Sequence, residues 1–254
     1  MKLTYIVQNN KYLNVKEILK AEFSLSDRLI ANLKNKEQIF LNNEKTFVSK
    51  LVKPKDKIEV FLDFEEESNN IIPTKMDLDI LYEDEALLII NKTASLAIHP
   101  SISHYTDSLS NGVKYYFEEK NLKIKIRPVN RLDKDTSGIV IFAKHSYIQE
   151  TLIHQMKTKE FQKKYLGLVN GIPLPKSSTI CAPITRKANS IIEREINLNS
   201  KLEKEQAITH YKTLEVLNNA SLVEFILETG RTHQIRVHCK YIGHSLIRRY
   251  FVWF

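Results

Sequence analysis

A charged and then polar segment interrupts the hydrophobic pattern of the chain at residues 65–75. It reads Glu-Glu-Glu-Ser-Asn-Asn-Ile-Ile-Pro-Thr-Lys, and acidic side chains followed by polar residues and a proline are typical of an interdomain linker. We therefore expect the chain to fold as two units, a small one at residues 1–64 and a larger one at residues 76–254.

The small unit is predicted to belong to the α+β class. Apolar side chains recur at helical spacing over residues 14–34, and Ser26 is a candidate N-cap that divides this stretch into two short helices. All six glycines of the chain lie at or after Gly112, so the turns of the small unit have to use Asn, Asp or Lys, as at Asn42-Asn43. Apolar patterns predict three short strands, at residues 38–41, 48–52 and 57–62.

The larger unit is predicted to contain a mixed, mostly antiparallel sheet. Apolar side chains at spacings of three and four predict helices at residues 108–119 and 146–157. Strands separated by helices and loops of varied length are typical of an α+β domain. The strand patterns lie at residues 78–82, 86–90, 138–143, 165–169, 210–216 and 222–227.

The charge balance favours a polyanionic partner. The chain has 38 Lys and Arg against 30 Asp and Glu, a formal net charge of +8. Residues 1–70 contain twelve basic and eleven acidic side chains, so residues 71–254 hold the remaining 26 and 19, an excess of +7. A basic surface can also serve solubility alone, so charge leaves nucleic-acid binding and solubility equally open.

Composition also excludes several classes of protein. No apolar run approaches the ~20 residues that a membrane-spanning helix needs, and residues 1–10 turn polar before a signal-peptide core could develop. We therefore expect a cytoplasmic protein with no membrane contact. Cys181 and Cys239 are the only two cysteines, which excludes a disulfide framework and a four-cysteine zinc site.

The densest cluster of charged and hydroxyl side chains lies at residues 127–138, directly before a hydrophobic strand. It reads Arg-Pro-Val-Asn-Arg-Leu-Asp-Lys-Asp-Thr-Ser-Gly. Such a loop can hold a carboxylate beside an arginine at a cleft, as a nucleophile or base, but a solvated turn is the simpler interpretation of the residues alone. Asp133 and Asp135 also allow a metal-dependent phosphate-transfer site. That site needs a buried strand before the acids, whereas here the strand follows them.

A second polar segment, at residues 228–244, is predicted to leave a strand and to continue as a helix capped by Thr232. Arg231 and Arg236 would then lie at or near the helix start, where guanidinium and backbone N–H groups suit a carboxylate or a phosphate. The segment also contains His233 and His238, which are five residues apart. Residues at this spacing do not share one helical face, so no metal site is expected there.

These two segments resemble the signatures of one enzyme family. Residues 130–138, Asn-Arg-Leu-Asp-Lys-Asp-Thr-Ser-Gly, resemble the His-Arg-Leu-Asp-x-x-Thr-Ser-Gly motif of the RluA/RluD-type pseudouridine synthases, and residues 230–238 resemble their third motif. The likeness runs from about residue 76 to residue 247. Residues 1–64 resemble the alpha-L RNA-binding domain that often precedes this catalytic domain, with a capping domain that does not touch RNA as the alternative. Shorter matches in the same order lie at Tyr82-Glu-Asp-Glu, Asn91-Lys92, His99-Pro100 and residues 163–171.

The resemblance implies an isomerase that converts uridine to pseudouridine in RNA, usually ribosomal RNA, as a monomer without a metal or nucleotide cofactor. Asp133 would start the reaction, by attack on the anomeric carbon or by removal of the sugar 2′ proton. Arg236 would pair with Asp133 and keep it ionised, and Tyr165 would contact the base and accept the proton from carbon 5. The residues expected to bind RNA are Arg131, Arg231 and His233.

The sequence departs from the family pattern in three places. Asn130 stands where the family has His, and Thr93 stands where a Pro usually follows the lysine. After Ile247 the family continues with Gly-Asp and further core elements, whereas residues 248–254 read Arg-Arg-Tyr-Phe-Val-Trp-Phe. We therefore expect a catalytic domain that is incomplete at its C-terminus and exposes apolar surface. The alternative function is a non-catalytic RNA-binding protein derived from a truncated synthase.

Overall fold

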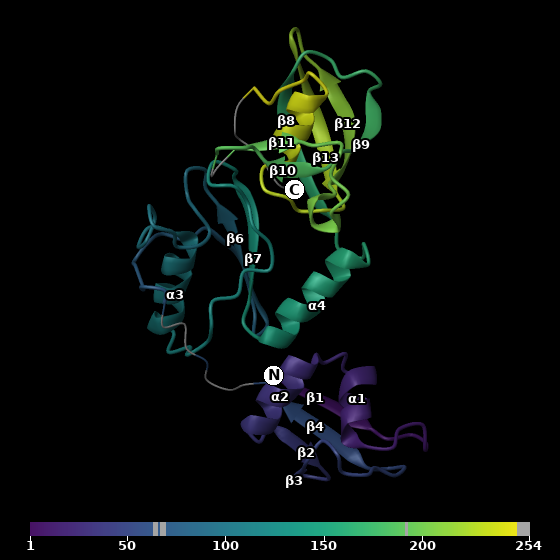
Figure 1. The fold of residues 1–254 in the computed structure, drawn as a ribbon. Helices are drawn as coiled ribbons and strands as arrows, with labels where there is room; N and C mark the ends of the chain where they lie inside the picture. Colours follow the sequence, from purple (N-terminus) through teal and green to yellow (C-terminus); the bar gives the residue numbers. More distant parts are fainter. Residues whose placement is uncertain (63–65, 67–69, 191–192, 248–254) are drawn as a thin grey trace.

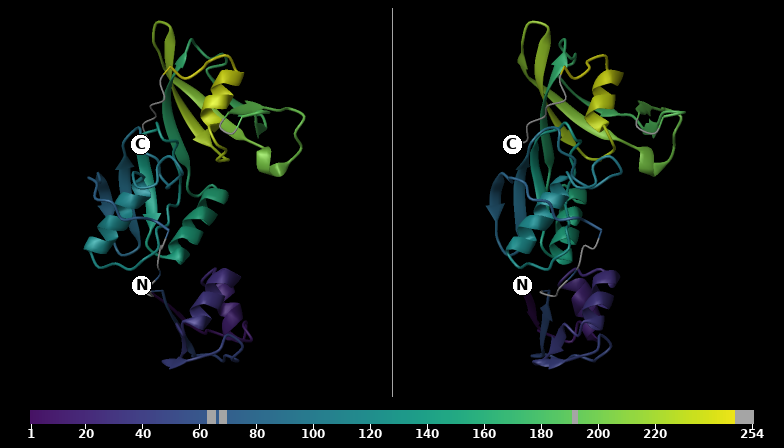
Figure 2. Two further views of the ribbon diagram at one scale, coloured as in Figure 1. Left: turned by 60° about the vertical axis from the view of Figure 1, so that its left-hand side comes forward. Right: turned by 90° about the vertical axis from the view of Figure 1, so that its left-hand side faces the viewer.

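The computed structural model describes residues 1–62, 66, 70–190 and 193–247. Residues 1–62 form a lobe at one end of an elongated molecule in all the views of Figures 1 and 2, and the rest forms a larger body. We call these parts the N-terminal lobe and the body. The tail at residues 248–254, on which the expected exposure of apolar surface depends, lies outside the described residues.

The N-terminal lobe combines a four-stranded antiparallel sheet, of order β1-β4-β2-β3, with two helices. Ser26 caps the second helix as expected, because its side-chain oxygen accepts the N–H of Leu29 at 3.2 Å. Asn42 and Asn43 close a hairpin with φ angles of 52° and 69°, which a two-residue hairpin turn requires and asparagine tolerates. The elements are β1 (Lys2–Ile6), α1 (Val15–Ala21), α2 (Asp27–Asn35), β2 (Ile39–Leu41), β3 (Glu44–Lys45) and β4 (Lys57–Phe61).

The strand expected at residues 48–52 is wrong. The carbonyl groups of Val48 and Lys50 accept the backbone N–H groups of Lys16 and Val15, at 2.9 and 3.0 Å. The first N–H groups of a helix have no partner within the helix, so this segment completes the start of α1 instead of joining the sheet. Strand β1, which was not predicted, takes the edge position beside β4.

The body is built on antiparallel sheets, which confirms the expected α+β class. One sheet has the order β5-β6-β7, a second has the order β8-β13-β12-β9, and β10 pairs with β11. The elements are β5 (Ile80–Glu83), β6 (Leu87–Lys92), α3 (Leu109–Glu119), β7 (Gly138–Ala143), α4 (Ser146–Lys157), β8 (Lys163–Asn170), β9 (Ser177–Cys181), β10 (Ile184–Arg186), β11 (Arg194–Ile196), the short 3-10 helix η1 (Glu203–Glu205), β12 (Ile208–Val216), β13 (Ala220–Leu227) and α5 (Gln234–Tyr241).

The β5-β6-β7 sheet is covered on both faces, with α3 and α4 on opposite sides (Figure 1). Alternate residues of β6 and β7 join one core with α3, and the residues between them pack against α4. This two-sided burial explains why the β6 segment reads as a continuous apolar run. The β8-β13-β12-β9 sheet and α5 contribute to the same core as α3, through Tyr165, Val223, Phe225, Ile235 and Cys239.

The N-terminal lobe has its own hydrophobic core, made of buried side chains between Val7 and Leu62. Its contact with the body is small. Tyr147 of α4 packs against the lobe core, and the Ser26 hydroxyl donates a hydrogen bond to Glu150 Oε1 at 3.0 Å. The described part of the expected linker lies along the body, because the N–H of Glu66 bonds to the carbonyl of Lys123 at 2.9 Å. None of the described helices has the length and apolar character of a membrane span.

Candidate active site

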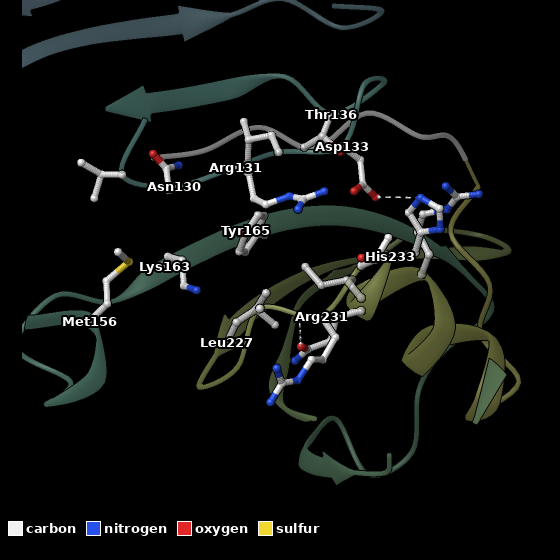
Figure 3. A pocket seen from close by; sticks show the side chains of 17 residues that line it. Asn130, Arg131, Asp133, Thr136, Met156, Lys163, Tyr165, Leu227, Arg231 and His233 are labelled. Carbon is white, nitrogen blue, oxygen red and sulfur yellow. Dashed lines mark hydrogen bonds and ion pairs between the residues drawn. The ribbon is translucent and has the colours of Figure 1, made fainter. Parts of the chain in front are cut away.

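A cavity of about 180 Å³ lies in the body between the segment before β7, strand β8 and the start of α5. In Figure 3, Arg131 and Asp133 face it from the upper segment, Tyr165 and Lys163 lie on β8, and His233 approaches Asp133 from the opposite wall. The six residues that the sequence indicated as site residues all line this cavity: Arg131, Asp133, Tyr165, Arg231, His233 and Arg236.

The segment that carries Asp133 is pinned to β7 by backbone and side-chain hydrogen bonds. The Val129 N–H donates to the Ile141 carbonyl at 2.7 Å. The Asn130 amide donates to the Ile139 carbonyl and accepts the Ile141 N–H, both at 2.9 Å. Asn130, one of the departures from the family pattern, therefore holds the loop that presents the carboxylate, because its side chain offers both a donor and an acceptor.

Lys92, at the end of β6, forms hydrogen bonds that hold the same loop. Its side chain is 1% exposed, and its Nζ donates to the carbonyl groups of Thr93, Leu96 and Lys134 at 2.9, 2.8 and 2.9 Å. Burial lowers the pKa of Lys92 to about 8, against the opposing effect of the Asp135 and Asp133 charges. The ammonium group therefore ties the backbone between two acidic residues to β6, a role that the sequence did not show.

Asp133 lies within ion-pair distance of a histidine, whereas Arg236 was the residue expected to pair with it. Its Oδ2 is 3.8 Å from His233 Nε2, the contact drawn as a dashed line in Figure 3. Arg236 lines the same cavity, but within the described part of the chain no ion pair joins it to Asp133. The helix start also differs from the prediction: α5 is capped by His233, not by Thr232, and His233 has a left-handed φ of 58°.

Tyr165 is 8% exposed at the inner end of the cavity. Burial raises the pKa of its phenol well above the ordinary value, and the charge of Asp133 raises it further. The phenol is therefore neutral at neutral pH, which suits contact with a base and disfavours proton abstraction. Lys163, two residues earlier on the same face of β8, also lines the cavity, and burial lowers the pKa of its amine. Lys163 begins the family-like segment at residues 163–171, but it was not among the expected site residues.

The two arginines expected to bind RNA are held differently. Arg231 donates through Nε to the Gln206 carbonyl at 2.9 Å and through Nη2 to the Glu203 carbonyl at 3.2 Å. These bonds fix the loop that forms one wall of the cavity. Arg131 is exposed and forms no ion pair or hydrogen bond with the residues that the structure describes, so its guanidinium is available to a ligand.

A buried polar chain anchors α5 to β12. Gln234 Nε2 donates to Thr209 Oγ1 at 2.9 Å, and Thr209 Oγ1 lies 2.9 Å from His238 Nδ1. His238 Nε2 lies 3.0 Å from the Ala182 carbonyl, so this nitrogen carries the proton, and burial lowers the pKa of the ring. Both nitrogens of His238 are thus used inside the protein, and the start of α5 is fixed where it meets the cavity.

Comparison with known proteins gives a consistent result. A family model described as RNA pseudouridylate synthase matches residues 86–241. The chain is 37% identical over 232 residues to an uncharacterized RNA pseudouridine synthase, YhcT, of Bacillus subtilis, covering 90% of this chain and 75% of that protein. It is 38% identical over 179 residues to ribosomal large subunit pseudouridine synthase D of Zymomonas mobilis, covering 69% of this chain and 56% of that one.

The fold agrees with a solved structure. Human RNA pseudouridylate synthase domain containing 1 superposes with a TM-score of 0.55 at 24% identity, covering 70% of this chain and 77% of that one. The family model spans more than half of the chain, and its limits enclose the cavity and both sequence signatures. The chain therefore belongs to the RNA pseudouridylate synthase family and is an isomerase.

Proposed function

We propose that this chain converts a uridine of structured ribosomal RNA to pseudouridine, and that Asp133 starts the reaction. The observation that carries the proposal is the placement of one partly exposed carboxylate at the edge of a small cavity whose other walls supply a neutral phenol and several cations. The ribosomal target is supported by the similarity to a synthase named for the large ribosomal subunit.

Two routes are open to Asp133, and both end in the same product. In the first, a carboxylate oxygen bonds to the anomeric carbon while the bond from that carbon to N1 of uracil breaks and the electron pair leaves with the base. In the second, the carboxylate removes the sugar 2′ proton and the base leaves. The detached uracil anion then turns, and its carbon 5 bonds to the anomeric carbon. In the first route the bond from that carbon to Asp133 breaks in the same step, and in the second the Asp133 carboxyl group returns its proton to the 2′ carbon. The proton of carbon 5 passes to solvent, and N1 takes up a proton from solvent.

The cavity walls suit the departing base. Lys163 supplies a cation to the wall, which would stabilise the negative charge that uracil carries after it detaches. Tyr165, kept neutral by burial, would contact the base and not take its proton. A uridine in a helical stem has to leave its stack to enter such a cavity, and the exposed guanidinium of Arg131 would replace it beside the remaining bases.

The test compares Asp133→Asn with Asp135→Asn in a single-turnover assay that follows release of tritium from carbon 5 of uridine. Asp133→Asn should lose at least about 10³-fold in rate, the scale of a missing proton-transfer or nucleophilic group, with RNA affinity within a few-fold of wild type. Asp135→Asn removes a carboxylate two residues away and should retain most of the rate. Turnover by Asp133→Asn would refute the assignment, and binding without turnover by the wild-type chain would favour the non-catalytic alternative.

A further inference from the structure

A second and larger cavity, of about 640 Å³, lies where the N-terminal lobe meets the body. We call it the lobe groove. One wall is formed by α2 and the other by residues 125–128 and the first turn of α4. In the views of Figures 1 and 2, α2 lies beside the N-terminal end of α4. The groove is therefore made by two parts of the chain that have separate hydrophobic cores.

The walls of the lobe groove carry two cations that have no ion-pair partner among the described residues. Arg28 of α2 and Lys125 of the body line it, both are exposed, and neither forms an ion pair with any residue that the structure describes. The remaining cation, Arg127, is paired with Glu66. The second carboxylate of the groove, Glu150, accepts a hydrogen bond from Ser26. Among the described lining residues, three cations thus face two carboxylates, and Arg28 and Lys125 lie on opposite walls.

Several of the other lining side chains are polar groups of the kind that contact nucleic-acid backbones. Asn32 and Asn35 belong to α2, and Gln149 belongs to α4, where its Nε2 donates to the Pro128 carbonyl at 3.0 Å. Amide side chains and cations suit phosphate and sugar contacts. The lining also contains four apolar residues: Leu29, Ala31, Ile126 and Pro128.

The lobe groove leads toward the active-site cavity. Residues 125–128 line the groove and residues 129–133 line the cavity, so one continuous segment passes from one to the other. Six residue steps separate Arg127 from Asp133, at most about 20 Å of chain. His99 also lines the groove, and burial together with the charge of nearby Arg131 lowers the pKa of its ring. Polar and cationic groups therefore continue between the two cavities.

We infer that the lobe groove binds the phosphate backbone of the RNA strand on one side of the target uridine, with Arg28 and Lys125 contacting phosphates from opposite walls. The inference rests on the proposed function in that RNA is taken as the substrate. The inference places the contact with the flanking RNA strand at the junction of lobe and body, and not on the lobe alone.

The experiment measures RNA affinity over a range of salt concentrations. The double variant Arg28→Ala/Lys125→Ala should bind RNA at least about tenfold more weakly, and its salt slope should fall by about 0.7 to 0.9 for each phosphate that is no longer neutralised. The control Lys34→Ala/Lys123→Ala removes two exposed charges from the same helix and the same body segment, outside the lobe groove. It should weaken binding clearly less. Glu150→Gln removes an opposing charge from the groove and should tighten binding.

Shortened substrates give the decisive comparison. When the RNA is trimmed on the flank that occupies the lobe groove, wild type and the Arg28→Ala/Lys125→Ala variant should bind it with equal affinity. The single-turnover rate of the variant at saturating RNA should stay within about twofold of the wild-type rate. Equal affinities and salt slopes of the two double variants on full-length RNA would overturn the inference, as would a deficit that persists on every trimmed RNA. Because wild-type turnover is scored separately, failure of the proposed reaction would be recognised independently.

Discussion

At the scale of single residues, the degree of burial distinguishes two ionisable groups of the active site, Asp133 and Tyr165. The Asp133 side chain is 30% exposed and has a histidine nitrogen 3.8 Å away, so water, substrate and a polar partner can all reach the carboxylate. Tyr165 is 8% exposed, and burial raises the pKa of its phenol. Under the proposed function, the accessible carboxylate would react and the neutral phenol would contact the uracil base.

Replacing Tyr165 with Phe tests this division. A neutral phenol supplies at most a hydrogen bond and ring contact, so Tyr165→Phe should slow a single turnover by no more than about tenfold, whereas removal of a proton-transferring base costs ~10²–10⁴-fold. The rates should be measured from pH 7 to 9. Two results would show that the phenolate is the proton acceptor after all. One is a decrease in rate of more than about 10³-fold, and the other is a wild-type rate that rises with pH in this range while the variant rate does not.

The site could be predicted from the sequence as a set of residues but not as a set of contacts. The two motifs and the segment of β8 indicated six side chains that line the cavity. They did not show that His233 Nε2 lies 3.8 Å from Asp133 Oδ2, at a helix start where His233 has a left-handed φ of 58°. Lys163 begins the matched segment at residues 163–171, but it was not predicted as a site residue, because a lysine at the start of a strand is usually solvent-exposed.

At the scale of elements, a lysine clamp links β6 to the loop before β7. Strand pairing sets Lys92 opposite Gly138, and its ammonium then meets three carbonyl groups, including that of Lys134 between the two aspartates. Without this donor, each of the three carbonyl oxygens would lack a hydrogen bond to a charged group. The clamp is therefore expected to fix both the fold of the loop and the position of Asp133.

Lys92→Met should lower the free energy of unfolding by about 2–4 kcal/mol, because the three carbonyl groups lose a buried charged donor, and should slow single turnover more than it weakens RNA binding. Lys134→Ala is the matched control, since it removes an exposed side chain and keeps the backbone carbonyl that Lys92 contacts. It should change stability by no more than about 0.5 kcal/mol. Equal denaturation midpoints for the two variants would show that the clamp is not structural.

Elements with a strong internal period were predictable, and those completed by distant partners were not. The helices expected at residues 108–119 and 146–157 are α3 and α4, with bounds that agree within one residue. They were predictable because apolar residues at spacings of three and four indicate both a helix and the face that packs against the protein. Residues 48–52 have the composition of a strand, yet their carbonyl groups satisfy the start of α1. The short strands β9 to β11 carry little apolar pattern and form only by pairing.

At the scale of the whole molecule, two separately cored parts meet over a small contact and a polar groove. Tyr147 and the bond from Ser26 to Glu150 hold the N-terminal lobe against α4, while the described residues of the connecting segment lie along the body. So small a contact contributes little to the stability of either part. Its effect is geometric, because it fixes the distance from Arg28 to the active site.

Removal of residues 1–62 should therefore affect binding far more than chemistry. Linked binding modules gain ~10²–10⁴-fold in affinity from their connection, so the deleted chain should bind structured RNA more weakly by up to that factor, with a single-turnover rate at saturating RNA close to wild type. Tyr147→Ala should weaken binding less, because the lobe stays tethered but is no longer held in one orientation. Thermal melts would verify that the body, which keeps its own core, remains folded in both variants. Unchanged affinity after the deletion would contradict this view and reduce the N-terminal lobe to a cap without RNA contact.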